Sequence, residues 1–252
     1  MLFWALAVSL GINGVLFLLA FWRQSDKLTD ASYALSFISV TLFGLSRGHG
    51  SAFNILAAML VCIWAVRIGS FLLYRVLKTG KDGRFDDMRS HFWRFGKFWL
   101  GQAITVWVLT LPVLLVFDRR ANWHNTALLG LLIWLIGVNT EAVADFQKYR
   151  FTHTPANKGQ WIDVGIWRYS RHPNYFGEIL VWIGIYLYAF PALNSTARWI
   201  GIISPLVITT LLLFVSGIPI LEKSADKKWG SDPKYQQYKQ RTSVLIPLPN
   251  KK

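Results

Sequence analysis

Apolar residues along this chain gather in seven long runs, separated by polar and mostly basic segments. The runs cover residues 2–22, 31–46, 52–74, 98–117, 126–146, 175–191 and 199–220. A helix needs about 20 apolar residues to cross a bilayer, and most of the runs approach that length. The second and sixth runs are the shortest. The pattern predicts an all-α, polytopic integral membrane protein with about seven transmembrane helices.

The distribution of Lys and Arg tests this segmentation independently. If the first, third and fifth connections and the C-terminal tail share one side, that side holds 22 basic residues. The opposite side holds 4, and Arg67 lies inside the third run. Because cytoplasmic loops collect Lys and Arg, we expect the N-terminus outside and the C-terminus in the cytoplasm.

Composition supports a membrane protein over other classes. Hydrophobic residues make up 53% of the chain and charged residues only 16%. In soluble domains about a quarter of all residues are charged. The net charge of +14 is explained by basic loops, and no nucleic-acid-binding motif accompanies it. Cys62 is the single cysteine, so an internal disulfide and a cysteine metal cluster are excluded.

Long connections are predicted only on the cytoplasmic side. They cover residues 75–97, 147–174 and 221–252, and no repeat or linker divides the chain. We therefore expect a single membrane domain over residues 1–252, with functional loops on that face. The tail mixes aromatic and basic residues, which fits either an amphipathic anchor at the lipid headgroups or a lid over a charged ligand.

Four charged residues lie within the apolar runs: Arg67, Glu141, Asp145 and Glu178. Arg67 must face the bundle interior, either in a structural ion pair, as a snorkelling side chain or in a functional role. Glu141 and Asp145 are four residues apart and share a helix face. Glu141 can serve as a structural partner of Arg67 or of another span, and Asp145 is a candidate ligand-binding residue. No metal-ligand spacing such as HExxH occurs, so no metal site is expected.

The stretch Arg171–Gly184 concentrates polar chemistry at the mouth of an apolar helix. Pro173 suits a first helical position and disfavours helical geometry at His172, so we expect the sixth helix to begin near Asn174. Asn174 and Glu178 then share one face, with Trp182 one turn further along.

The residues before this helix favour an anion. Arg171 and His172 precede a helix N-terminus, whose free amides attract negative charge. Phosphate at this point, hydroxyls at Asn174 and Glu178, and a flat ring against Tyr175 or Trp182 together describe a nucleotide-like ligand. Interfacial anchoring explains Arg171 and Tyr175 but leaves Glu178 without a role.

The segment WRYSRHPNYFGEILVWIG, the position of Asp145, and the closing YKQRTSVLIP resemble the steroid 5α-reductase family, particularly its bacterial branch. The resemblance extends from about Trp64 to Pro247. Its RHPNYxGE motif is shared with the sterol C14 and C7 reductases and the isoprenylcysteine carboxyl methyltransferases. On this basis residues 98–252 form the reductase-like C-terminal region, residues 1–97 supply the substrate-side helices, and a bacterial cytoplasmic membrane is favoured over the endoplasmic reticulum.

The resemblance implies NADPH in the cytoplasmic half of the bundle and a lipophilic enone substrate from the membrane. Asn174, Glu178 and Asp145 would bind polar groups of the cofactor, and Arg168, Arg171 and His172 its phosphates. The other implied cofactor contacts are Arg84, Tyr175, Trp182 and Tyr238.

The substrate carbonyl needs a positioned donor, because negative charge develops on its oxygen during hydride transfer. By the resemblance, Asp30 is the candidate for the family's glutamate and would act protonated; alternatively, it is a helix N-terminal residue stabilised by the dipole. Arg67 is the second polar candidate in the first three runs. Trp64 stands where the family has a tyrosine.

Together these features predict an NADPH-dependent reductase of the carbon–carbon double bond of a steroid-like or isoprenoid enone, an oxidoreductase of lipid metabolism. The alternatives are an S-adenosylmethionine-dependent membrane methyltransferase and a non-enzymatic lipid receptor or transporter. The expected partners are the lipophilic substrate and membrane lipids, without nucleic acid. The sequence gives no oligomeric state.

Overall fold

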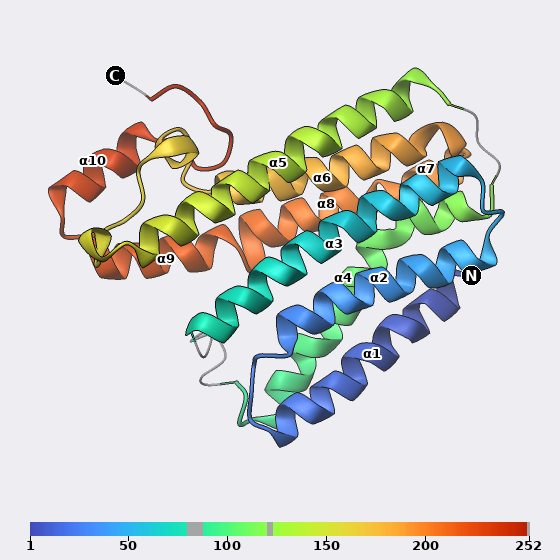
Figure 1. Ribbon diagram of the computed structural model, residues 1–252, viewed down its shortest axis with the longest axis horizontal. Helices are drawn as coiled ribbons and strands as arrows, with labels where there is room; N and C mark the ends of the chain where they lie inside the picture. Colours follow the sequence, from blue (N-terminus) through green and yellow to red (C-terminus); the bar gives the residue numbers. More distant parts are fainter. Residues whose placement is uncertain (80–87, 120–122, 251–252) are drawn as a thin grey trace. The chain divides into compact units, whose positions relative to one another are not determined.

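Helices carry the backbone through every apolar run, because a bilayer offers no water to satisfy exposed amide and carbonyl groups. The computed structural model describes residues 1–79, 88–119 and 123–250. Figure 1 shows that helices dominate these ranges. The longer helices are α1 (Leu2–Trp22), α2 (Thr29–Arg47), α3 (Ala52–Thr79), α4 (Phe92–Phe117), α5 (Asn125–His153) and α6 (Pro173–Ala189).

Shorter helices complete the second half of the chain. They are η2 (Pro155–Asn157), η3 (Gly165–Arg168), η4 (Phe190–Ala192), α7 (Ser195–Gly201), α8 (Ile203–Thr210), η5 (Leu211–Val215), α9 (Ile218–Trp229) and α10 (Pro233–Arg241). Helix α6 begins at Pro173, which confirms the predicted use of this proline at a helix start.

The protein is an all-α, multi-pass membrane protein, as the hydrophobic pattern predicts. Six helical stretches in the described ranges are long and apolar enough to cross a bilayer: α1, α3, α4, α5, α6 with η4, and the stack from Ser195 to Trp229. The expected second crossing, residues 31–46, forms α2 but does not meet this measure. The count of seven and the orientation stay predictions.

Helix α2 contains a larger share of polar residues than the six stretches above, and several of their side chains face other helices. It packs against α1, α3 and α4, and Ser32 and Ser36 are fully buried. The Asn13 amide of α1 donates to the Ser36 hydroxyl at 2.9 Å, and Gln102 of α4 donates to Ser32 at 2.7 Å and to Asn13 at 2.9 Å. Interhelical hydrogen bonds of this kind hold membrane helices together, so α2 needs less apolar surface.

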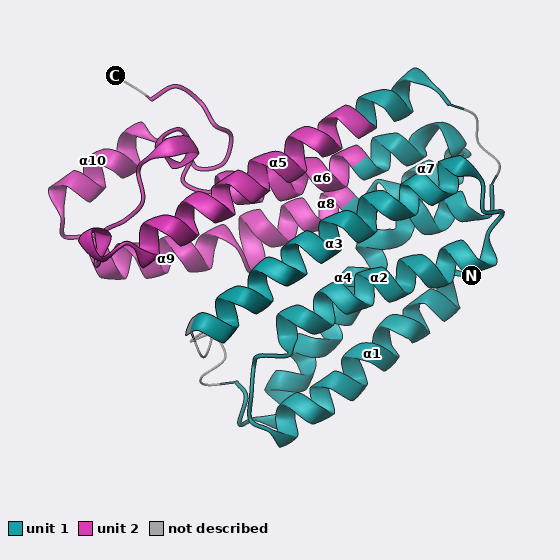
Figure 2. Cartoon of the chain, viewed as in Figure 1, with its two compact units in different colours: residues 1–130, 185–204 teal, residues 131–184, 205–252 magenta. Residues whose placement is uncertain are grey.

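The chain divides into two compact units by its internal packing (Figure 2). Unit 1 comprises residues 1–130 and 185–204, and unit 2 comprises residues 131–184 and 205–252. The first boundary between the units lies within α5. The division at residue 97 into substrate-side and reductase-like regions stays a prediction. Helices α5 and α6 each contribute residues to both units.

The final apolar stretch is a series of segments and not one regular helix. Its π-helical turn, η5, ends at Val215. At Gly217, the residue that precedes α9, an added Cβ would lie 2.4 Å from the Leu212 carbonyl oxygen. Glycine is therefore required by this close approach, and α9 begins directly after it. The expected crossing at residues 199–220 thus continues into α9, which carries Glu222.

Two glycines let α5 and α6 approach closely within unit 2. A Cβ on Gly177 would lie 2.6 Å from the Glu141 amide nitrogen, and a Cβ on Gly137 would lie 2.7 Å from the Val181 amide nitrogen. Small residues permit this backbone contact between membrane helices. The earlier residue of α5 lies near the later residue of α6, so the two helices run antiparallel. Asp145, one turn beyond Glu141 on α5, therefore lies toward the N-terminal end of α6.

Substitution of Gly177 by alanine should therefore destabilise the protein. The atom that the new Cβ meets belongs to the backbone, so we expect a loss of about 1–3 kcal/mol, measured by thermal unfolding in detergent. Gly101→Ala on α4 is the control, because a Cβ there has no neighbour within 4 Å. An equal loss in both variants would contradict the close contact of α5 and α6.

Candidate functional site

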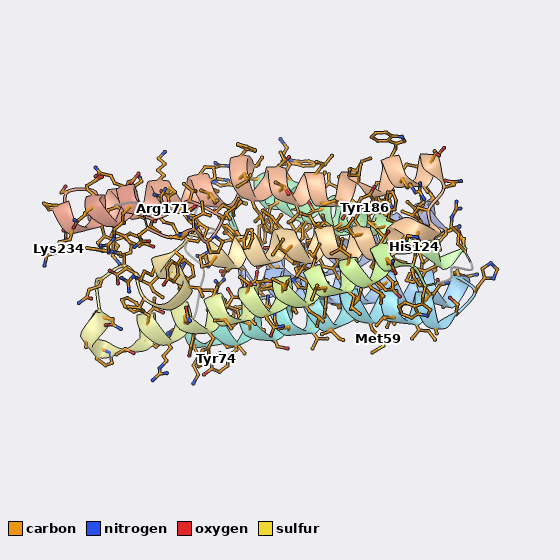
Figure 3. The ribbon with its side chains drawn as sticks, turned by 90° about the horizontal axis from the view of Figure 1, so that it is seen from above. Met59, Tyr74, His124, Arg171, Tyr186 and Lys234 are labelled. Atoms are coloured by element: carbon orange, nitrogen blue, oxygen red, sulfur yellow. The ribbon has the colours of Figure 1, made fainter. Side chains whose placement is uncertain are left out.

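Glu222 of α9 is the shared acceptor for the residues that precede α6. The Arg171 guanidinium donates to both of its oxygens, from Nε at 3.1 Å and from Nη2 at 3.0 Å. His172 lies with Nε2 2.8 Å from Oε1, and the Lys239 ammonium lies 3.5 Å from Oε2. A single partly buried carboxylate thus joins α6, α9 and α10. Figure 3 shows Arg171 beside the red ribbon of the C-terminal helices.

The C-terminal tail is bound to the segment before α6 by further hydrogen bonds. Arg171 Nη1 donates to the Lys239 carbonyl at 2.6 Å, and its backbone amide donates to the Ser243 carbonyl at 2.9 Å. The buried Tyr238 hydroxyl donates to the Trp167 carbonyl at 2.9 Å. Burial raises the pKa of Tyr238 well above its ordinary value, so this hydroxyl remains a donor. The tail therefore packs on the polar motif.

A cavity of about 300 Å³ lies among these elements, wholly within unit 2. Its walls combine positive charge with aromatic rings. They include Lys148, Trp161, Trp167, Arg171, His172, Glu222, Lys228, Trp229, Tyr235 and Tyr238. The Lys148 ammonium lies 4.7 Å from the centre of the Trp167 ring, and Trp161 packs edge-on against Tyr235 at 5.3 Å. This lining suits a ligand that carries both negative charge and a flat ring.

His172 is buried on this wall and has one nitrogen without a protein partner. Burial lowers its pKa below the ordinary 6.5, while the hydrogen bond to Glu222 partly opposes that effect. Because a carboxylate only accepts, Nε2 carries the proton of the neutral ring and Nδ1 is an acceptor. Within the described ranges, neither His172 Nδ1 nor the buried Nε1 of Trp161 has a hydrogen-bond partner. A ligand or water that bonds them would remove a desolvation cost.

The other predicted cofactor residues of α5 and α6 lie at the close contact of these helices. Asp145 and Glu141 are almost fully buried on α5, and Trp182 is fully buried on α6. Asn174 and Glu178 are half-buried and occupy one face of α6. The antiparallel register brings Asp145 to the level of Asn174. Two residues at one level could contact the same cofactor, and that contact stays a prediction.

The remaining predicted cofactor residues have different surroundings. Tyr175 stacks on the His172 ring with centroids 5.8 Å apart, and Arg168 is exposed at the end of η3. Arg84 lies outside the described residues. Arg171 donates hydrogen bonds to Glu222 and to a tail carbonyl, and thereby holds the tail. Its contact with phosphate stays a prediction.

The two predicted substrate-side residues belong to unit 1. Asp30 lies in the first turn of α2 with its carboxylate 3.8 Å from the Arg75 guanidinium. An ion pair requires the ionised carboxylate, so a protonated Asp30 would have to leave Arg75. Arg67 is half-buried on α3, one turn after Trp64. Trp64 is fully buried and packs edge-on against Phe37.

Sequence reasoning missed Glu222 and two of the aromatic residues that line the cavity, Trp229 and Tyr235, although it named Tyr238. Glu222 lies just after the last apolar run and is followed by several lysines. A carboxylate at the end of a membrane helix indicates a basic partner on another part of the chain. The pairing of Glu222 with Arg171, 51 positions earlier, is visible only after folding. Among the described residues, no group of three or more His, Cys, Asp or Glu side chains could hold a metal ion.

Comparison with known proteins adds a family and a distant relative. A family model described as "Protein of unknown function (DUF1295)" matches residues 16–242. An uncharacterized protein of Schizosaccharomyces pombe is 22% identical, over 96% of this chain and 78% of the yeast protein. No solved structure matches the chain significantly.

Removal of the Glu222 charge should destabilise unit 2. Glu222→Gln leaves Arg171 and Lys239 without their shared counter-charge in a partly buried site, which costs on the order of 3 kcal/mol. Hydrogen exchange of α10 and thermal unfolding in detergent measure the loss. Asp226→Asn is the control, because this carboxylate is 44% exposed and its pair with Lys239 lies near solvent, so the substitution should cost under about 1 kcal/mol. Equal effects would refute the central role of Glu222.

Stability should also fall as the pH drops below about 6.5. The pKa of folded His172 is lowered, so the unfolded chain binds the proton more readily. The stabilisation by neutral His172 is therefore complete above its unfolded pKa and is lost as the pH falls through its folded pKa. His172→Gln keeps a donor toward Glu222 without titrating. Its melting temperature should depend less on pH between 7.5 and 5.5 than that of the unmodified protein. Parallel curves would contradict the assignment.

Proposed function

The chain belongs to the DUF1295 family, within the steroid 5α-reductase-like superfamily, and from this premise we propose that it is an NADPH-dependent reductase of a lipophilic enone. One observation carries the proposal. The start of the RHPNYxGE motif and the tail together line a cavity whose walls present cations, aromatic rings and two buried polar atoms without protein partners. This chemistry matches one end of a phosphorylated dinucleotide.

The residues present fit this cofactor by charge and shape. Lys148 and Lys228 supply positive charge for phosphate, and Trp161, Trp229 and Tyr235 supply faces for a ring. Ligand pockets commonly measure about 300–1,000 Å³, so this cavity is at the small end and would hold one end of the dinucleotide. Asp145, Asn174 and Glu178 continue along α5 and α6 and would bind its hydroxyl and amide groups.

Bound NADPH supplies the hydride, and the protein supplies position and electrostatics. As hydride reaches the β-carbon of the enone, negative charge develops on the carbonyl oxygen, where a fixed donor lowers the barrier. Asp30 and Arg67 of unit 1 remain our candidates for this polar group. The carboxylate of Asp30 pairs with Arg75, and a carboxylate cannot donate a hydrogen bond. Of the two candidates, the guanidinium of Arg67 is therefore the better donor to the substrate carbonyl.

The methyltransferase alternative fits the cavity less well. S-adenosylmethionine carries a sulfonium cation, which the basic residues Lys148 and Lys228 would repel, whereas the phosphates of NADPH would be attracted. The same residues argue against a neutral sterol as the ligand of this cavity. A lipid receptor would have no use for a cavity lined by cations and hydrogen-bonding groups.

The proposal is tested by ligand-induced stabilisation and by turnover. NADPH should raise the melting temperature of the purified protein, and S-adenosylmethionine should not. Lys148→Gln should weaken NADPH binding about tenfold through the loss of one charged hydrogen bond. Lys158→Gln removes an exposed charge from the same segment and should change nothing. Incubation with a 3-oxo-Δ4-steroid should yield a product two hydrogens heavier by mass spectrometry.

Two results would overturn the proposal. Stabilisation by S-adenosylmethionine alone would favour the methyltransferase. Equal NADPH affinity in the Lys148 and Lys158 variants would place any cofactor site elsewhere.

A further inference from the structure

A second and larger hollow lies on the outer side of α5, also wholly within unit 2. It measures about 650 Å³ and is open to the surroundings. One part of its lining is apolar, with Val143 44% exposed and Phe146 62% exposed. The other part is polar and includes Arg150, Thr154 and Asn157. The hollow therefore changes from apolar to polar along the axis of α5.

The wall opposite α5 is fixed by a tight contact. The Gln147 side chain accepts a hydrogen bond from the Ile166 amide at 3.0 Å. Gly165, which has a φ of +61°, lies so close that an added Cβ would meet Gln147 Oε1 at 2.3 Å. A side chain at position 165 is excluded by both the conformation and the space. The hollow is thus formed by the fold and does not require a ligand to open it.

Arg150 provides the charge at the polar end. Within the described ranges no hydrogen bond or ion pair engages its guanidinium, and the side chain is exposed. The nearby Thr154 hydroxyl and Asn157 amide already donate to the backbone carbonyls of Arg150 and Phe151. The guanidinium is therefore the group that can receive an anion, and its planar fork suits phosphate.

The position of Arg150 along α5 corresponds to the surface of a bilayer. An exposed apolar stripe on the same helix contains Leu132, Leu135, Ile136, Val143 and Phe146. From Leu128, which is 54% exposed, to Phe146 the helix rises about 27 Å, close to the ~30 Å thickness of the hydrocarbon core. Arg150 follows Phe146 by one turn, so we expect its guanidinium at the depth of the lipid phosphate groups. Basic residues follow at Lys158 and Arg168.

We propose that this hollow binds an anionic phospholipid of the leaflet that faces the basic loops. An acyl chain lies along Val143 and Phe146, and the headgroup phosphate is held by Arg150. The segment from Lys148 to Arg168 is basic, so it attracts a lipid with net negative charge. A zwitterionic headgroup also carries a cation, which the same basic residues repel. This site is separate from the inner cavity, so it does not depend on the proposed enzymatic function.

Native mass spectrometry and thermal unfolding in detergent test the site with two lipids, phosphatidylglycerol and phosphatidylcholine. Phosphatidylglycerol should remain bound and raise the melting temperature, and phosphatidylcholine and inorganic phosphate should have little effect. Arg150→Gln should weaken phosphatidylglycerol binding about fivefold. Arg94→Gln, which removes an exposed arginine at the start of α4, is the matched control and should leave binding unchanged.

Each variant is compared with its own lipid-free melting temperature, so a change in folding does not obscure the result. Phe146→Ser gives a second reading, because it removes the apolar contact and retains the charge, and it should also weaken binding. Equal losses in the Arg150 and Arg94 variants would show only non-specific attraction and overturn the proposal. Equal retention of both lipids, or stabilisation by inorganic phosphate alone, would also overturn it.

Discussion

The interaction on which unit 2 depends is the pairing of Glu222 with Arg171, His172 and Lys239. These four residues come from three parts of the chain: the segment before α6, helix α9 and helix α10. The pattern of apolar runs does not predict contacts among these parts. A bidentate arginine–carboxylate pair has a fixed geometry, so it orients α9 relative to the start of α6. Lys239 then ties α10 to the same carboxylate. Together with the hydrogen bonds of the Tyr238 hydroxyl and of the Arg171 backbone amide, this cluster holds the aromatic residues of the tail near the motif.

The close packing of α5 and α6 has a complementary role. Gly137 and Gly177 allow the backbones to touch, which fixes the register of the two helices. That register places Asp145 at the level of Asn174. The ionic cluster therefore positions the tail, while the glycine contact positions the acids and amides on the helices. Both contacts lie within unit 2, so the candidate cofactor residues there share one packed framework.

In unit 1, neutral polar groups link helices α1, α2 and α4. Asn13, Ser32, Ser36 and Gln102 satisfy one another between α1, α2 and α4. Such a network specifies helix pairing without the high desolvation cost of buried ions. Among the predicted substrate-side residues, Asp30 lies near the helix end, where an arginine from α3 can reach it. The acidic residue was identified from the sequence, but its basic partner was not.

The sequence by itself determined the all-α membrane class, the approximate limits of the helices and the start of α6 at Pro173. These features depend on local composition, on the energetic cost of exposed backbone in lipid, and on the geometry of proline, all of which can be read over short distances along the chain. The tertiary structure alone decided that α2 is supported by buried polar groups, that Arg171 pairs with Glu222, and that aromatic residues of the tail line the cavity. Each of these depends on residues that are far apart in sequence, and a charge or amide does not specify its partner until packing has brought the two together.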